Sequence, residues 1–152
     1  MELNSSSKAK LKGVHPDLVR VVNRCAKDWA DKQFTFGLTC GVRTLEEQKV
    51  LVKKGASKTL KSRHIPAKNG YSHAVDVVAM LDGKVRWDWG LYIKIANAIK
   101  DAAIKEKVPV EWGGTWKLLN NVNSSLSAAD LSRTFPDGPH FQLPVNQYNG
   151  SK

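Results

Sequence analysis

The segment HAVDVVAM, residues 73–80, decides the fold because it sets one carboxylate, Asp76, inside an apolar run. A run this short predicts a strand, since it is too brief for an independent helix. A carboxylate inside an apolar strand is costly unless it meets a cation, accepts several hydrogen bonds or binds a metal. The pattern therefore leaves two interpretations of Asp76 open, a structural salt bridge and a metal site.

On the N-terminal side of this segment, helical and strand patterns alternate. Residues 1–13 are polar and basic and predict a mobile arm. Pro16 then opens a helix, residues 34–40 (FTFGLTC) predict a strand, and a capping box that begins at Thr44 predicts a helix ending at Gly55. The apolar positions of the first helix recur at helical spacing: Leu18, Val21, Val22, Cys25 and Trp29. This spacing predicts a helix that buries one face in the core.

On the C-terminal side, an amphipathic helix begins at Leu91 and ends before Pro109. Residues 108–114 (VPVEWGG) predict a strand, residues 117–134 an excursion rich in Asn and Ser, and residues 136–144 (PDGPHFQLP) a turn that leads into a short strand. Helices and short strands without regular βαβ alternation predict an α+β fold, in which a small antiparallel sheet is flanked by about three helices.

Length and composition favour one compact domain, here residues 14–148, because the chain has 152 residues of which 41% are apolar. Lys and Arg exceed Asp and Glu by 24 to 14, which gives a net charge of +10. Such a charge favours a polyanionic partner: nucleic acid, teichoic acid, lipopolysaccharide or a bacterial wall. Charge alone does not choose among these partners.

The N-terminus carries no apolar run of the kind that a secretory signal needs, and no segment approaches the roughly 18 apolar residues of a transmembrane helix. We therefore expect a protein made as a soluble cytoplasmic species, which another factor must release. The two cysteines, Cys25 and Cys40, lack CxxC spacing and predict free thiols.

Five residues could carry chemistry, and they come from two distant segments: His64, His73, Asp76, Asp137 and His140. A catalytic zinc takes three His or carboxylate ligands, and a further carboxylate can move the proton of the attacking water. The five residues include enough histidines and carboxylates for three zinc ligands and one general acid/base. The chain has no H-E-x-x-H, G-x-S-x-G or phosphate-binding glycine loop, which disfavours helix-borne zinc proteases, serine hydrolases and nucleotide enzymes.

The order GVRT, SRH, HAVD, EWGG and DGPHFQL closely resembles the zinc peptidases of the D-alanyl-D-alanine carboxypeptidase and dipeptidase family, whose fold is hedgehog-like. Within that family it is most similar to phage endolysins that act as L-alanyl-D-glutamate peptidases. The resemblance runs from about Val14 to about Leu143. It implies zinc ligands at three positions, His64, Asp76 and His140, and a general acid/base at Asp137.

The resemblance also implies roles in substrate binding and catalysis. Arg43 in GVRT matches the arginine that faces the scissile carbonyl and would stabilise the oxyanion. Ser62 matches the serine that begins the histidine motif and would contact substrate or orient the site. Trp112 would wall the cleft, with a place in the core as the alternative.

His73 is the alternative to His64 as a metal ligand, because residues 65–72 (IPAKNGYS) lengthen the gap between the two halves of the motif. On a regular strand, however, His73 and Asp76 are three residues apart and project to opposite faces. His64 can lie on a neighbouring loop, with the additional residues forming a longer turn. Strand geometry therefore favours His64 as the ligand.

The function implied is that of a zinc-dependent endolysin, which cleaves the L-alanyl-D-glutamate bond of the peptidoglycan stem peptide and is antimicrobial. We expect a monomer that is held in the host cytoplasm, is released by a holin to the periplasm and cell wall, and binds the anionic envelope rather than nucleic acid. Two alternatives stay open: a D-alanyl-D-alanine carboxypeptidase or dipeptidase, and a non-catalytic basic protein that binds the wall or nucleic acid.

Overall fold

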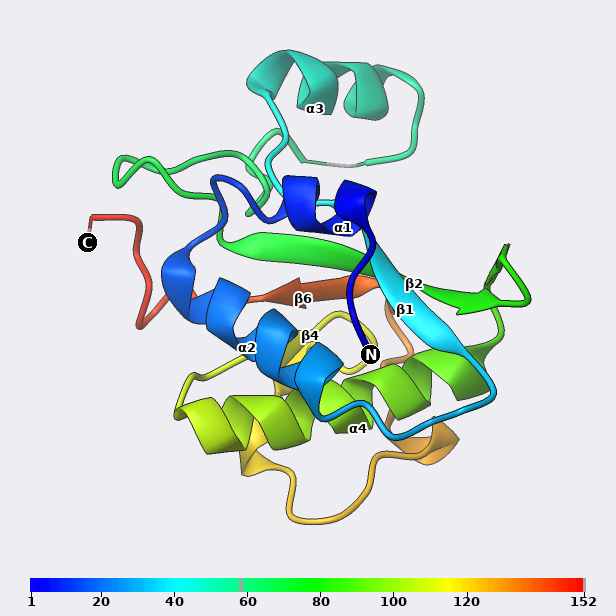
Figure 1. Ribbon diagram of the computed structural model, residues 1–152. Helices are drawn as coiled ribbons and strands as arrows, with labels where there is room; N and C mark the ends of the chain where they lie inside the picture. Colours follow the sequence, from blue (N-terminus) through cyan, green and yellow to red (C-terminus); the bar gives the residue numbers. More distant parts are fainter. Residues whose placement is uncertain (58, 152) are drawn as a thin grey trace.

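The computed structural model describes residues 1–57 and 59–151, and this part of the chain forms the predicted α+β fold (Figure 1). The α-helices of these residues are α1 (Ser5–Lys10), α2 (Pro16–Lys27), α3 (Leu45–Lys53) and α4 (Trp89–Glu106). The strands are β1 (Thr35–Cys40), β2 (Ala74–Leu81), β3 (Lys84–Arg86), β4 (Glu111–Trp112), β5 (Lys117–Leu118) and β6 (His140–Gln142). Two 3-10 turns, Leu119–Asn121 and Ala128–Asp130, lie in the predicted excursion.

The strands form one sheet in the order β1-β2-β6-β4-β5, and β3 pairs with the far end of β2. Every pairing among these strands is antiparallel. The segment that contains Asp76 is therefore the central strand β2, with β1 on one side and β6 on the other. Alternate residues of β2, Val75, Val77 and Ala79, belong to the hydrophobic core, so Asp76 projects from the opposite face.

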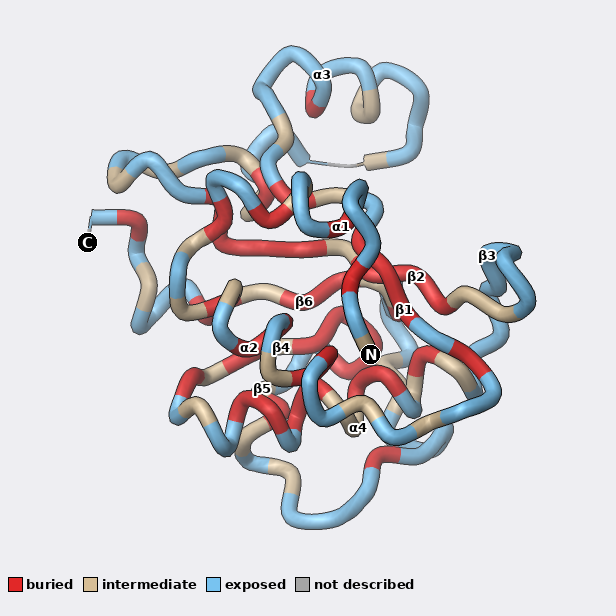
Figure 2. Tube along the Cα trace, in the orientation of Figure 1, coloured by how far each residue is buried: buried red, intermediate tan, exposed pale blue. Residues whose placement is uncertain are grey.

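Helices α2 and α4 pack together against the core face of the sheet (Figures 1 and 2). Leu18, Val21, Val22 and Cys25 of the predicted stripe are buried on α2, and Ile95 and Ile99 are buried on α4. Trp29, the last predicted position, lies beyond α2 and is partly buried. Trp112 and Phe141 add two fully buried aromatic rings from β4 and β6. Together they form the continuous core that holds β2 and β6 in place.

The N-terminal residues correct the prediction of a mobile arm. Asn4 caps α1 through its side chain, and Leu3 and Leu11 are buried in the core. The Ser7 hydroxyl accepts a hydrogen bond from the backbone of Leu38 in β1 at 2.9 Å. The prediction was wrong because α1 has no apolar stripe to indicate its packing. The buried groups are Leu3 before the helix, Leu11 after it and the Ser7 hydroxyl within it.

Helix α3 stands apart from the rest of the molecule (Figure 1). Thr44 and Glu47 form the predicted capping box, with both reciprocal hydrogen bonds present. Among the described residues of α3, Gln48 is the one that is buried. The helix is therefore held by local caps and polar contacts more than by apolar packing. In the described part of the chain, no helix combines the length and hydropathy needed to cross a bilayer.

Candidate functional site

Strand register gathers the site on the sheet face that points away from α2 and α4. Asp76 pairs with Cys40 of β1 on one side and with His140 of β6 on the other. The register between β1 and β2 shifts between Leu38 and Cys40, an irregularity that lets β1 return to the Asp76 position at its end. Three adjacent strands thus present three potential metal ligands in one row.

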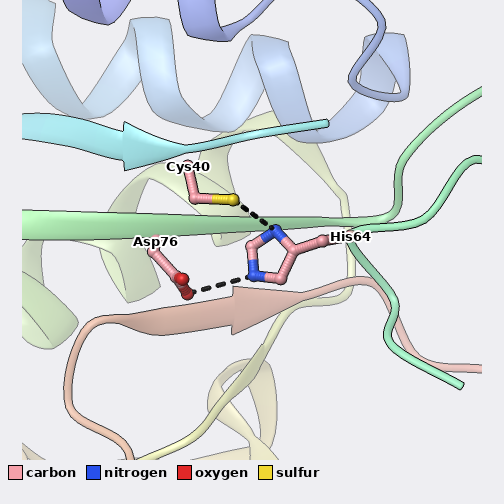
Figure 3. A group of neighbouring side chains, drawn as sticks. All are labelled: Cys40, His64 and Asp76. Atoms are coloured by element: carbon pink, nitrogen blue, oxygen red, sulfur yellow. Dashed lines mark hydrogen bonds and ion pairs between the residues drawn. The ribbon is translucent and has the colours of Figure 1, made fainter. Parts of the chain in front are cut away.

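Two histidines approach the same carboxylate oxygen. The Nε2 of His64 and the Nδ1 of His140 each lie 3.2 Å from Oδ1 of Asp76, and the two rings meet edge to face at 5.2 Å between centroids. Cys40, His64 and Asp76 also form a compact group whose possible ligand atoms lie within 4.8 Å of one another (Figure 3). The geometry fits a metal-binding site.

The other ring nitrogen of each histidine has its own partner. Nδ1 of His64 lies 2.9 Å from the backbone oxygen of Gly41, so it must carry the hydrogen that this contact requires. Nε2 of His140 lies 2.8 Å from Oε1 of Gln142, with the same consequence. On each ring, the nitrogen that faces Asp76 is therefore the one available to a metal ion or, in its absence, to a proton, which is the usual arrangement of histidines that bind a metal.

An unpartnered atom supports this arrangement. Nε2 of His64 is buried and makes no hydrogen bond within the described residues, although it lies close to Asp76. A buried nitrogen lone pair beside a carboxylate is unfavourable unless a cation or a proton lies between them. The two imidazoles and the carboxylate are therefore suited to hold a divalent ion.

The carboxylates of the site have opposite electrostatics. Burial opposes ionisation of Asp76, but the hydrogen bond from His140 and the positive charge that His140 and His64 carry when protonated hold its pKa well below the usual range. Burial raises the pKa of Asp137, and the negative charge of Asp76 raises it further. Asp76 is thus a permanent anion, whereas Asp137 is a carboxylate that gains a proton readily, as a general acid/base must.

A close backbone approach positions Asp137. Its amide donates to the backbone oxygen of Gly113 at 2.9 Å, and the amide of Gly113 donates to His140 at 2.8 Å. A Cβ at Gly113 would collide with the carbonyl of Asp137 and lie 3.1 Å from the Cβ of His140. The first glycine of EWGG therefore lets the ligand strand and the Asp137 turn lie against β4.

Arg43 lies over the site at the strand-to-helix corner. Its Nη2 is 3.6 Å from Oδ2 of Asp76, and its Nη1 donates to Oε1 of Gln48 at 2.9 Å. The amide of Gln48 donates in turn to the hydroxyl of Ser57 and the carbonyl of Thr59. The buried glutamine therefore fixes the guanidinium and joins α3 to the loop that follows it.

These residues border a cleft of about 440 Å³. The predicted site residues in its lining are Arg43, Ser62, His64, Asp76, Asp137 and His140. The hydroxyl of Ser62 accepts from the backbone of His64 at 3.2 Å, so Ser62 caps the turn that presents this ligand. Trp112 does not line the cleft: it is fully buried and donates from Nε1 to Gly138. Trp116, which is half-exposed, is the tryptophan in the lining.

His73 lies elsewhere. Its ring is buried 5.4 Å from the ring of His15, and its Nε2 is 3.1 Å from the side-chain nitrogen of Asn69. Burial and the positive charges of Arg63 and His15 lower its pKa to about 4. The structure thus brings His64, not His73, to Asp76, and the longer loop is accommodated away from the site.

Four contributors to the site went unrecognised in the sequence: Cys40, Gln48, Gln142 and Trp116. Strand periodicity could have indicated Gln142, because it lies two residues after His140 and shares its face. Gln48 resembles any polar residue of an exposed helix. Cys40, a free thiol like Cys25, borders the site only because of the register shift in β1.

Comparisons with known proteins agree with this geometry. The model of a family described as phage L-alanyl-D-glutamate peptidase matches residues 1–144. An L-alanyl-D-glutamate peptidase of Listeria phage A118 is 32% identical over 107 residues, which cover 70% of this chain and 30% of the relative. The chain therefore spans about a third of that protein. The crystal structure of the L-Ala D-Glu endopeptidase ChiX of Serratia marcescens is 38% identical, with a TM-score of 0.75 over 97% of this chain and 93% of ChiX.

Proposed function

Because this chain belongs to the phage L-alanyl-D-glutamate peptidase family, we propose that it is a zinc-dependent peptidase that hydrolyses the L-alanyl-D-glutamate bond of peptidoglycan. The observation that carries the proposal is the approach of two imidazole nitrogens to one oxygen of Asp76, with Asp137 and Arg43 on the same cleft. The names of the phage A118 and Serratia relatives indicate the bond.

The residues that would hold the zinc are His64 through Nε2, Asp76, and His140 through Nδ1. Cys40 is the competing ligand, but its sulfur lies 3.6 Å from Nδ1 of His64, the nitrogen whose hydrogen Gly41 accepts. That nitrogen has no lone pair for a metal, and Nε2 faces Asp76 instead (Figure 3). Cys40 therefore supports the ring of His64 rather than completing the ligand set.

A bound zinc ion supplies Lewis acidity toward the scissile carbonyl and lowers the pKa of water toward neutrality. Asp137 takes the proton of the attacking water and returns it to the leaving amine, a task for which its raised pKa suits it. The guanidinium of Arg43, which Gln48 holds, stabilises the negative charge that develops on the carbonyl oxygen. Ser62 keeps His64 in place through the turn that it caps.

The basic charge supports a lytic role at the bacterial envelope. A net charge of +10 favours adsorption to anionic wall polymers and lipopolysaccharide, with binding that weakens as salt rises. As an endolysin, the protein would act as a monomer, wait in the host cytoplasm and reach the wall when a holin opens the membrane.

Digestion of purified peptidoglycan tests the function directly. We expect new N-terminal D-glutamate, identified by mass spectrometry, and no free D-alanine. Wild-type protein should produce it, and Asp137→Asn should reduce the rate by about a thousandfold, the usual order for loss of a catalytic acid/base. Release of D-alanine with intact L-alanyl-D-glutamate would identify a D-alanyl-D-alanine carboxypeptidase and contradict the proposal.

A further inference from the structure

A second hollow borders Asp137, which also lines the cleft. It has a volume of about 300 Å³ and is lined by Trp87, Trp89, Tyr92, Pro136, Asp137, Gly138 and Pro139. Asp137 borders both spaces, so the hollow opens directly beside the proposed catalytic carboxylate. A substrate that extends past Asp137 from the cleft would therefore reach the hollow.

The hollow has a rigid aromatic wall. The ring of Trp87 is stacked on that of Tyr92, with an interplanar angle of 3° and centroids 6.0 Å apart, and Trp87 is nevertheless 65% exposed. Tyr92 is fixed by donating its hydroxyl to the carbonyl of Arg86 at 2.7 Å. Trp89 packs against Gly138, where an added Cβ would lie 3.0 Å from the indole ring. The exposed indole of Trp87 is thus supported by the ring of Tyr92, which is itself held in place.

The two sides of Asp137 differ in charge. The lining of the cleft toward α3 includes the cations Arg43 and Lys61. In the aromatic hollow, Asp137 is the one residue of the lining that carries a charge. The cleft side therefore suits an anionic group, and the hollow suits a neutral one with apolar faces.

The proposed substrate has the same asymmetry across its scissile bond. On the D-glutamate side, the peptide keeps a free α-carboxylate. On the L-alanine side, the amino group is joined through the lactyl group to N-acetylmuramic acid, a neutral sugar one residue from the bond. Pyranose rings present C–H groups that pack on aromatic faces, as other apolar groups do.

We propose that the hollow formed by Trp87, Trp89, Pro136 and Pro139 binds the N-acetylated saccharide of the glycan strand, while Arg43 and Lys61 face the anionic peptide. This inference rests on the proposed function and assigns the direction in which the substrate lies. Trp87 supplies the stacking face, and Trp89 with the two prolines shapes the space.

A pair of soluble substrates tests the assignment. One is the disaccharide-bearing stem peptide, and the other is the same peptide with an N-acetyl group in place of the saccharide. We expect wild-type protein to show a kcat/KM about tenfold higher on the saccharide-bearing substrate, the effect of one well-packed aromatic contact. Trp87→Ala should bring the ratio close to one, and Trp87→Tyr should keep most of it. Ile104→Ala, an exposed apolar position on α4 that does not line the hollow, should leave the ratio unchanged.

The outcomes separate this inference from the proposed function. Cleavage of both substrates with equal kcat/KM by wild-type protein would overturn the saccharide site and leave the peptidase activity standing. Cleavage of neither would overturn both. An unchanged ratio in Trp87→Ala, together with a change from dimer to monomer, would assign the aromatic surface to self-association and also overturn the inference.

Discussion

The two faces of strands β2 and β6 have opposite tasks, although they consist of alternate residues. Val75, Val77 and Phe141 point to α2 and α4 and are buried with apolar neighbours. Asp76 and His140 point the other way and are partnered by polar groups. The core face therefore supplies the stability that holds the other face in a fixed geometry, and each can be altered separately.

The largest effect is expected on the polar face. Asp137→Asn should lower the peptidase rate by about a thousandfold or more without lowering the free energy of unfolding. Since burial and Asp76 raise the pKa of Asp137 in the metal-free protein, a neutral amide should even stabilise the fold slightly in EDTA. Peptidoglycan turbidity assays and urea unfolding measure the two quantities. Parallel losses of rate and stability would show that the faces are not independent.

The matching change on the core face is Phe141→Ala. The ring is fully buried, and its removal should cost about 3 to 5 kcal/mol of unfolding free energy. Because Phe141 and its neighbour His140 point to opposite faces of β6, any protein that remains folded should still bind metal. Urea unfolding measures the loss, and a cost below about 1 kcal/mol would contradict the packing described for β6.

Arg43→Ala should reduce kcat by about a hundredfold, the usual loss for one oxyanion-stabilising group. The free energy of unfolding should fall by about 1 to 3 kcal/mol, because Oε1 of the buried Gln48 loses its partner while the capping box of α3 is unchanged. Lys53→Ala, an exposed cation at the far end of α3, is the control and should retain full activity. If both variants lost activity equally, the effect would come from surface charge rather than from the fixed guanidinium.

Replacing His73 should have a smaller, pH-dependent effect on the free energy of unfolding. Its pKa is about 4 in the folded protein and near 6.5 when unfolded, so the unfolded chain binds more protons between these values. The contribution of the neutral ring to the free energy of unfolding is fully present above pH 6.5 and is lost as the pH falls toward 4. His73→Gln should therefore remove at most about 3 kcal/mol of the pH dependence in this window. If the free energy of unfolding depended equally on pH in wild type and His73→Gln, this prediction would be wrong.

Gln142→Ala is expected to have the smallest effect on the polar face. Without its oxygen at 2.8 Å, the tautomer of His140 is no longer fixed, and metal affinity should fall by about tenfold. Competition with a fluorescent chelator measures the affinity. Gln147→Ala, an exposed glutamine near the C-terminus, serves as the control. Equal affinities of Gln142→Ala and wild type would mean that Asp76 alone orients the ring.

Periodicity and caps predicted most of the fold, because β2, α2, α4 and the Thr44 capping box follow from local patterns. The packing of α1 was not predicted, because it depends on contacts with β1, which lies about 30 residues further along the chain. The gathering of His64, Asp76 and His140 followed from a family resemblance. Trp112 takes the place in the core that was the alternative for it, and Trp116, in the turn between β4 and β5, lines the cleft.

The metal content of matched variants tests the central claim most directly. After zinc loading and dialysis, wild type, Cys40→Ser and His73→Ala should each keep about one zinc ion per chain, whereas His64→Ala and His140→Ala should lose it. Loss of zinc in Cys40→Ser, with full retention in His140→Ala, would contradict the ligand set formed by His64, Asp76 and His140.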